Sequence, residues 1–140
     1  MRLMEAHEAV NLIKSRQRVY IHEAAMAPTS LIDALVDRAD ELRDVELVHL
    51  HTDVPAPYAD PQYAGHLRHN AFFVGSNVRP AVNDGRADFT PVFLSEIPRM
   101  IADGTLPIDV ALVQLSPPDK HGYCRLGTSI ACARAAVDHA

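Results

Sequence analysis

The sequence predicts a single-domain α/β fold: an open, mostly parallel sheet flanked by helices on both faces. Short apolar segments rich in β-branched residues alternate with segments whose apolar side chains recur at helical spacing. The apolar run 110–115 is stopped by Ser116-Pro117-Pro118 and leads through a mixed loop into an Ala-rich segment. Strand, rigid loop and helix in this order are typical of the ligand-binding edge of a parallel sheet. A chain of 140 residues suits one domain with a real core.

The first half of the chain gives five expected elements. Apolar residues at helical spacing predict a helix over 4–14, and a β-type run follows at 18–22. Thr29 or Ser30 can cap a helix that runs to about residue 42. Residues 45–50 read as the second strand. The proline-rich stretch 52–62 is a long loop, and residues 63–69 are expected to form a helical turn.

The second half continues the alternation. We expect a strand over 71–74, ended by Gly75, and a helix over 78–84 with Gly85 at its C′ position. A short strand at 88–90 and a helix at 94–103, ended by Gly104, follow. The run 110–115 is then expected to be the central strand. It ends at Ser116, because the consecutive prolines that follow cannot continue a ladder. The last helix is expected over 130–137. It ends without a Gly, Pro or basic cluster, which favours the chain being the front part of a longer protein.

Composition and charge limit the classes of partner. Hydrophobic residues make up 48% of the chain and charged residues 22%, as in ordinary globular domains. A net charge of −5 argues against a nucleic-acid partner, since phosphate binding needs a basic face. We expect no membrane partner, because no apolar run approaches the roughly 20 residues that span a bilayer. Cys124 and Cys132, without a CxxC pair, favour reduced thiols and a cytoplasmic location.

Histidine spacing offers one alternative function. His49 and His51 would share a face of a strand, and His66 and His69 would be neighbours on a helix. With Asp53 they form a hypothetical zinc or iron site of a metal-dependent enzyme. No HExxH or comparable motif frames them. Polar histidines on loops and strand ends are the simpler interpretation, so no metal ligand is assigned.

Two further groups have a chemical and a plain interpretation. Glu23 and Glu96 are the carboxylates nearest to expected loop positions, and each is more simply a solvated side chain or a helix cap. Gly127-Thr128-Ser129 could place free amides and hydroxyls at a helix start, either to bind an anion or only to cap the helix. No GxGxxG or Gly-x-Ser-x-Gly motif is present.

Four segments closely resemble the acetyl-CoA hydrolase/transferase family, a group of class I CoA-transferases that includes 4-hydroxybutyrate and acetate CoA-transferases. They are Phe72 to Arg79, Asn83 to Pro91, Phe93 to Pro98 and Ser116 to Cys124. The last is the most specific, and the resemblance covers essentially all of residues 1–140. It implies an amino-terminal domain whose partner domain, outside this sequence, supplies the catalytic glutamate. No catalytic residue is therefore assigned here, and residues 1–140 alone are expected to be inactive.

The resemblance further implies the ligands and partners. Acyl-CoA and a short carboxylic acid would be the substrates. CoA would move between them through a glutamyl-CoA intermediate, or acetyl-CoA would be hydrolysed. No cofactor would be permanently bound. We expect Ser116 and His121 to face the interdomain cleft and Met26 to pack near the acyl chain. Pro117-Pro118-Asp119 could instead only brace the domain interface. A homo-oligomer is expected, and a non-catalytic, self-associating module is the remaining alternative.

One departure from the family pattern stands out. Relatives tend to have a small residue, often glycine, after the first strand, where His22-Glu23 stands in this sequence. The resemblance therefore leaves the shape of the following loop, up to Pro28, as the point where this chain is expected to differ.

Overall fold

The computed structural model describes residues 2–140 and contains one sheet of five strands in the order β4-β3-β2-β1-β5. The strands are β1 Arg18–Ile21, β2 Val45–His49, β3 Leu67–Ala71, β4 Asp88–Phe89 and β5 Val110–Leu112. Each pair of neighbouring strands is parallel. Successive strands move outward from β1 to β4, and β5 returns to the other side of β1. The order therefore reverses between β1 and β5, and the predicted open parallel sheet is confirmed.

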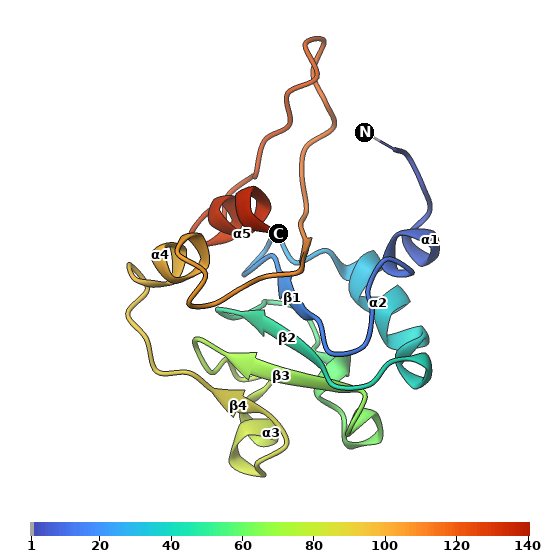
Figure 1. Cartoon of the computed structure of the whole chain (residues 1–140), viewed down its shortest axis with the longest axis vertical. Coiled ribbons are helices and arrows are strands. Elements are labelled where there is room, and N and C mark those ends of the chain that lie inside the picture. Colours follow the sequence, from blue (N-terminus) through green and yellow to red (C-terminus); the bar gives the residue numbers. More distant parts are fainter. Residues whose placement is uncertain (1) are drawn as a thin grey trace.

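Helices cover both faces of the sheet, as predicted (Figure 1). They are α1 Ala6–Val10, α2 Thr29–Asp37, α3 Arg79–Asn83, α4 Ile97–Ala102 and α5 Ala133–His139. Short 3₁₀ turns occupy Ala39–Glu41, Pro57–Ala59 and Pro61–Tyr63. α1 and α2 pack on one face, whereas α4 and α5 pack on the other. Within residues 2–140, no helix is both long and apolar enough to cross a bilayer.

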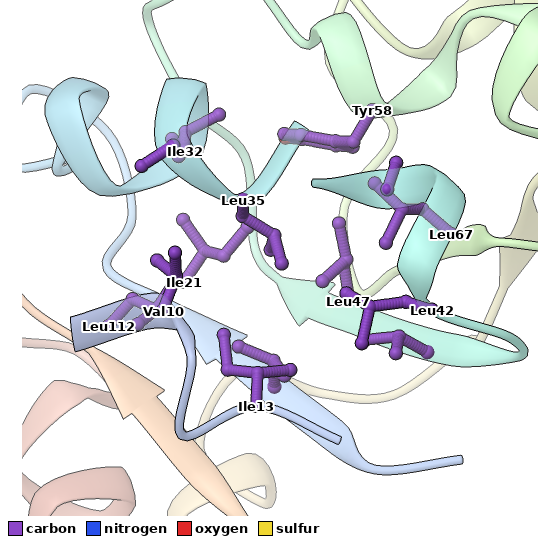
Figure 2. Packing of buried hydrophobic residues seen from close by; sticks show 14 of the residues in the cluster. Val10, Ile13, Ile21, Ile32, Leu35, Leu42, Leu47, Tyr58, Leu67 and Leu112 are labelled. Atoms are coloured by element: carbon purple, nitrogen blue, oxygen red, sulfur yellow. The ribbon is translucent and has the colours of Figure 1, made fainter. Parts of the chain in front are cut away.

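Strand alternation divides the core into two clusters. Val19 and Ile21 of β1 point toward α1 and α2, whereas Tyr20 between them points toward α4 and α5. On the first face, Leu35 of α2 packs with Ile21, Leu47 and their neighbours (Figure 2). Fully burying a side chain of this size stabilises the fold by roughly 1.5–3 kcal/mol, so this face carries much of the stability.

The third strand lies earlier than predicted. The apolar run Phe72-Phe73-Val74 suggested a strand at 71–74, and 63–69 suggested a helical turn. In the structure β3 is Leu67–Ala71, paired with β2 from Val45 onward, and only Pro61–Tyr63 form a 3₁₀ turn. Leu67, His69 and Ala71 are the buried residues of β3, with the more polar Arg68 and Asn70 between them. This strand is not recognisable from alternating apolar residues, because one of its three buried positions is a histidine.

The run 110–112, expected to be the central strand, forms β5 at the edge of the sheet, where it pairs with β1. The remaining differences are in length. α1 is shorter than 4–14, α2 ends at Asp37 before a 3₁₀ turn, and α4 covers less than 94–103. β5 ends at Leu112 rather than at 115, because the next amide that faces the β1 segment, that of Gln114, donates to the His22 side chain and not to a backbone carbonyl. α5 begins at Ala133, which places Gly127-Thr128-Ser129 in an irregular segment rather than at a helix start. Gly85 and Gly104 follow their helices with positive φ, as predicted for C′ glycines.

Candidate functional site

The carboxyl ends of the strands meet at one edge of the sheet, and the strand order reverses there between β1 and β5. Ligands of open parallel sheets bind in the crevice at such a reversal. Two loops leave from this point: residues 22–28 after β1, and residues 113–132 after β5. We call residues 113–132 the arm, because they project away from the sheet and helices before returning to α5 (Figure 1).

The arm is held together by its own hydrogen bonds. The Ser116 N–H donates to the Arg125 carbonyl at 3.0 Å, and the Arg125 N–H donates to Ser116 Oγ at 2.9 Å. The Ser116 hydroxyl also donates to the Pro117 carbonyl at 3.1 Å. These bonds join the outgoing and returning limbs across the stem of the arm. Ser116 therefore has a structural role in the arm, and its predicted contact with substrate stays a prediction.

A tight turn closes the tip of the arm. The Asp119 carboxylate accepts N–H bonds from His121 at 2.8 Å and from Tyr123 at 3.0 Å. The Gly122 N–H donates to the Asp119 carbonyl at 2.9 Å, and Gly122 has a φ of 85° that favours glycine. His121 is exposed beside this turn. Its side chain is available to a partner or ligand, and its predicted place in the cleft stays a prediction.

Met26 lies at the base of the arm rather than at its stem or tip. Its side chain is half-buried, and a Cβ at Gly127 would stand 2.6 Å from the Met26 Sδ. Gly127 also has a φ of 79°, a backbone conformation that favours glycine, and a Cβ there would force the Met26 thioether to shift. The structure thus places Met26 beside Gly127 on the returning limb of the arm. Contact of Met26 with an acyl chain stays a prediction.

The Glu23 side chain is buried inside the protein. It is 2% exposed, it accepts the Tyr20 hydroxyl, and its Oε1 accepts the Cys132 N–H at 3.3 Å just before α5. Loss of solvation raises the pKa of this carboxyl, partly offset by backbone hydrogen bonds. Burial, and then the adjacent Glu23, raise the pKa of the Cys132 thiol to about 12. Glu23 therefore links the end of β1 to the start of α5, and the expectation of a solvated side chain is wrong for it: it is a buried acceptor for the amide at the N-cap position of α5.

Glu96 is also a helix-terminal residue. It stands at the N-cap position of α4 and is exposed, and its Oε2 accepts the Phe93 N–H at 3.2 Å. For Glu96 the plain interpretation of a solvated side chain at a helix start is confirmed.

The hypothetical four-histidine metal site is wrong. His49 and His69 stack with ring centroids 4.1 Å apart, buried beside Tyr58. His51 lies near Asp53 at the strand ends, and His66 contacts the Leu42 carbonyl at 2.9 Å. Among residues 2–140, no group of three His, Cys, Asp or Glu side chains is arranged to hold a metal ion. The reason is that residues 66–69 are not helical, so His66 and His69 are not neighbours on one face.

The buried histidine pair is a core feature. The His49 Nε2 is 2.6 Å from the Tyr58 hydroxyl, and the His69 Nδ1 is 2.9 Å from the Leu47 carbonyl. Burial lowers the pKa of His69 to about 4, and burial together with the two neighbouring histidines lowers that of His49 well below its usual value. Both rings are therefore neutral near neutral pH, which suits a hydrogen-bonded core and not a cationic site.

His22 is a residue of this edge whose role the sequence did not reveal. It follows β1, it is fully buried, and both ring nitrogens have partners in the arm: Ser129 and Gln114. The available signal was the expectation that His22-Glu23 departs from the family pattern. Periodicity could not interpret it, because the two partners lie about a hundred residues away along the chain.

An apolar pocket adjoins the same edge. It has a volume of about 260 Å³ and is lined by Leu50, His51, Phe72, Phe73, Val92 and Leu94. Phe73 and Leu94 are more than half exposed. A patch of this kind, at the carboxyl end of β2 and β3, is suited to contact with an apolar group or another protein surface.

Comparisons with known proteins agree with this architecture. The family model "Acetyl-CoA hydrolase/transferase N-terminal domain" matches residues 1–140. The chain is 42% identical over 135 residues to a succinyl-CoA:acetate/propanoyl-CoA:succinate CoA transferase of Fasciola hepatica, covering 95% of this chain and 28% of that protein. It is 43% identical over 128 residues to 4-hydroxybutyrate coenzyme A transferase of Clostridium kluyveri, covering 91% of this chain and 30% of that protein.

A solved structure shows the same fold. The 4-hydroxybutyrate CoA-transferase of Porphyromonas gingivalis superimposes with a TM-score of 0.78 at 27% identity, over 99% of this chain and 31% of that one. The chain thus spans about 30% of the length of the relatives it matches. Sequence and fold lead to one conclusion: this chain belongs to the acetyl-CoA hydrolase/transferase family, and it matches the N-terminal domain of that family.

Proposed function

We propose that residues 1–140 are the amino-terminal part of a CoA-transferase that moves CoA between an acyl-CoA and a short carboxylic acid. The carrying observation is the match to the family's N-terminal domain over residues 1–140, together with 42–43% identity to two CoA-transferases. The reversal of strand order between β1 and β5, with the arm leaving beside it, supports the assignment because ligands of open parallel sheets bind at such a reversal, so these residues can supply one wall of the site. The other wall would come from polypeptide that lies outside this sequence.

The proposed reaction splits one difficult step into easier ones through a covalent intermediate. A glutamate carboxylate of the other domain attacks the thioester carbonyl carbon, and the CoA thiolate leaves to give a mixed anhydride. The thiolate then attacks the glutamyl carbonyl, which releases the acyl group as its carboxylate and forms a glutamyl-CoA thioester. An acceptor carboxylate reverses these steps and departs as the new acyl-CoA. Water in place of the acceptor would give hydrolysis.

Residues 1–140 would bind and orient the substrates. Ser116 and His121 are assigned to the cleft side of the arm, and Met26 to the acyl group at its base. Half-burial of Met26 and exposure of His121 support these roles, because both side chains have surface open to a ligand. We also expect homo-oligomers, supported by the exposed Phe73, Phe93 and Leu94, and a cytoplasmic location, supported by two free cysteines.

A chimaeric enzyme tests the proposal. Residues 1–140 would replace the matching stretch of the Clostridium kluyveri 4-hydroxybutyrate coenzyme A transferase, and exchange between 4-hydroxybutyryl-CoA and acetate would be followed by chromatography. We expect exchange by the chimaera and none by residues 1–140 alone. Omitting acetate and measuring free CoA thiol separates transfer from hydrolysis. A folded chimaera without exchange, or robust turnover by the 140-residue chain, would contradict the assignment.

A further inference from the structure

We propose that His22 is a positioning residue that fixes the direction of the arm at the edge of the sheet. As a role in catalysis this rests on the proposed function, because the arm carries Ser116 and His121. As a statement about the fold it stands on the contacts of His22 alone.

The His22 ring joins the two limbs of the arm where they leave the body of the protein. Its Nε2 lies 2.5 Å from the Ser129 carbonyl on the returning limb, and its Nδ1 accepts the Gln114 N–H at 3.2 Å on the outgoing limb. A carbonyl oxygen only accepts, so Nε2 carries the proton and Nδ1 supplies the lone pair. One neutral tautomer therefore satisfies both bonds at once.

The backbone of His22 adds a third point of attachment. Its N–H donates to the Leu112 carbonyl at 2.9 Å, which extends the ladder between β1 and β5 by one bond beyond the paired residues. The direction in which the ring points is thus set by the sheet itself. A side chain anchored in this way transmits the orientation of the sheet to Gln114 and Ser129.

Burial makes these bonds consequential. His22 is 0% exposed, so loss of either partner would leave a polar nitrogen inside the protein. The arm lacks a comparable internal constraint at its base, because its own cross-bonds lie farther out, between Ser116 and Arg125 and around Asp119. Without His22 the stem and tip can keep their internal structure while the arm as a whole changes direction.

Neighbours of His22 reinforce the base on the returning side. Met26 packs against Gly127, and Glu23 accepts the Cys132 N–H. Both contacts hold the returning limb, whereas the outgoing limb is tied through the His22 Nδ1 bond to Gln114. His22 therefore couples the two limbs at their base, as Ser116 does farther out at the stem, which distinguishes it from a residue that only fills space.

Native and introduced cysteines allow a direct measurement of arm direction. Cys124 is exposed on the arm, Cys132 is buried, and Ser30 is exposed on α2. Spin labels on Cys124 and on Ser30→Cys report the distance from the arm to the body by pulsed electron paramagnetic resonance. We expect one narrow distance distribution in the parent chain and a distribution about twice as wide or wider in His22→Leu, which keeps the bulk but loses both bonds.

Two conservative variants separate the limbs. His22→Asn can keep an acceptor for the Gln114 N–H, and His22→Gln can keep a donor for the Ser129 carbonyl. Each should give a width between those of the parent and His22→Leu. They also decide the matter if His22→Leu fails to fold. The control is Ile13→Val, in the core cluster on the α1 and α2 face, which should lower the melting temperature but leave the distribution narrow.

The proposal is overturned if the folded His22 variants keep the parent distribution, or if Ile13→Val broadens it equally. The chimaeric enzyme provides the separate functional readout, with His22→Leu expected to lower kcat/KM for exchange more than Ile13→Val does. An inactive chimaera would count against the proposed function only, because the label distances are measured without any reaction.

Discussion

At the scale of single residues, the edge of the sheet is organised by buried polar side chains. His22 and Glu23 follow β1 directly, and both lie inside the protein with hydrogen-bonded partners from the end of the chain. Such groups are costly to bury unless they are paired. Their partners therefore specify where the arm and α5 must lie. Gly127 completes the base: its φ of 79° favours glycine, and a Cβ there would displace the Met26 thioether.

Gly127→Ala is expected to lower the free energy of unfolding by about 1–3 kcal/mol, through strain at positive φ and overlap with the Met26 thioether. Chemical denaturation monitored by circular dichroism measures this. Adding Met26→Ala should remove the steric overlap but leave the backbone strain at residue 127. The double variant should therefore be less destabilised than the sum of the two single variants. Strict additivity would show that Met26 and Gly127 do not interact.

Tyr58→Phe removes the hydroxyl that bonds the buried His49 Nε2 at 2.6 Å. We expect a loss of about 1–3 kcal/mol in unfolding free energy, because a buried ring nitrogen would lose its partner. Urea denaturation at neutral pH checks this. Tyr63→Phe is the matched control, since Tyr63 is only partly buried, and it should change stability by less than about 0.5 kcal/mol.

At the scale of elements, the arm behaves as a small structured unit attached at one place. Asp119 orders the tip through two N–H bonds, and Ser116 ties the stem to Arg125. The prolines at 117 and 118 restrict the outgoing limb, because their φ angles are fixed. β1 and β5 set the point of attachment. The arm is thus ordered locally by its own residues, whereas its direction is set by contacts with the loop after β1.

Asp119→Ala should loosen the tip without unfolding the domain. Both tip amides would lose their acceptor, and Lys120 and Arg125 lie beside them as trypsin sites. We expect cleavage in the arm to accelerate by roughly tenfold, as local opening becomes easier by about 1.4 kcal/mol. Mass spectrometry of timed digests measures the rate. Asp103→Ala, on a different loop, serves as the control and should leave cleavage after Lys120 unchanged.

At the scale of the whole molecule, pH acts on the core through the stacked histidines. An unfolded histidine takes up its proton near pH 6.5, whereas His69 in the folded protein does so near pH 4 and His49 well below its usual value. Between these values the unfolded state holds more protons. The contribution of these two histidines to the free energy of unfolding is therefore fully present above about pH 6.5 and is lost as the pH falls toward 4. Glu23 acts in the opposite direction. Because its pKa is raised in the folded protein, its contribution to the free energy of unfolding is lost as the pH rises through that folded-state pKa.

Urea denaturation at about pH 7.5, 6.5 and 5.5 checks this dependence. Each histidine contributes up to about 1.4 kcal/mol per pH unit within its window. His69→Asn, which can retain a donor toward the Leu47 carbonyl, should reduce the slope below pH 6.5. His139→Asn, in which an exposed histidine is replaced, should not. An unchanged slope in His69→Asn would show that this buried ring is not responsible.

The exposed apolar side chains bear on assembly of the whole chain. Phe73, Phe93 and Leu94 are more than half exposed near the carboxyl end of the sheet. We expect the isolated chain to self-associate as its concentration rises, because such patches are buried where a partner is available. Light scattering over a concentration series measures this. Phe93→Ser should weaken self-association. Leu3→Ser, near the start of the sequence and outside this group of side chains, should not. A strictly monomeric parent chain would contradict the expectation.

The sequence by itself determined the α/β class, the parallel sheet and the family. These depend on local periodicity and on short motifs such as residues 116–124, which are properties of neighbouring residues. It could not place β3, because the pattern Leu67, His69, Ala71 is recognisable as buried only when β2 lies beside it. Nor could it group the histidines correctly: it paired His66 with His69 on a helix that does not form, whereas His69 stacks on His49 of the neighbouring strand.

Only the tertiary structure decided what His22, Glu23 and Met26 do. Their partners Gln114, Ser129, Cys132 and Gly127 come from the far end of the chain. They are brought close because β5 returns to the side of β1. A hydrogen bond between residues about a hundred positions apart leaves no periodic trace in the sequence. It arises from the order of the strands, which fixes the base of the arm at the reversal of the sheet.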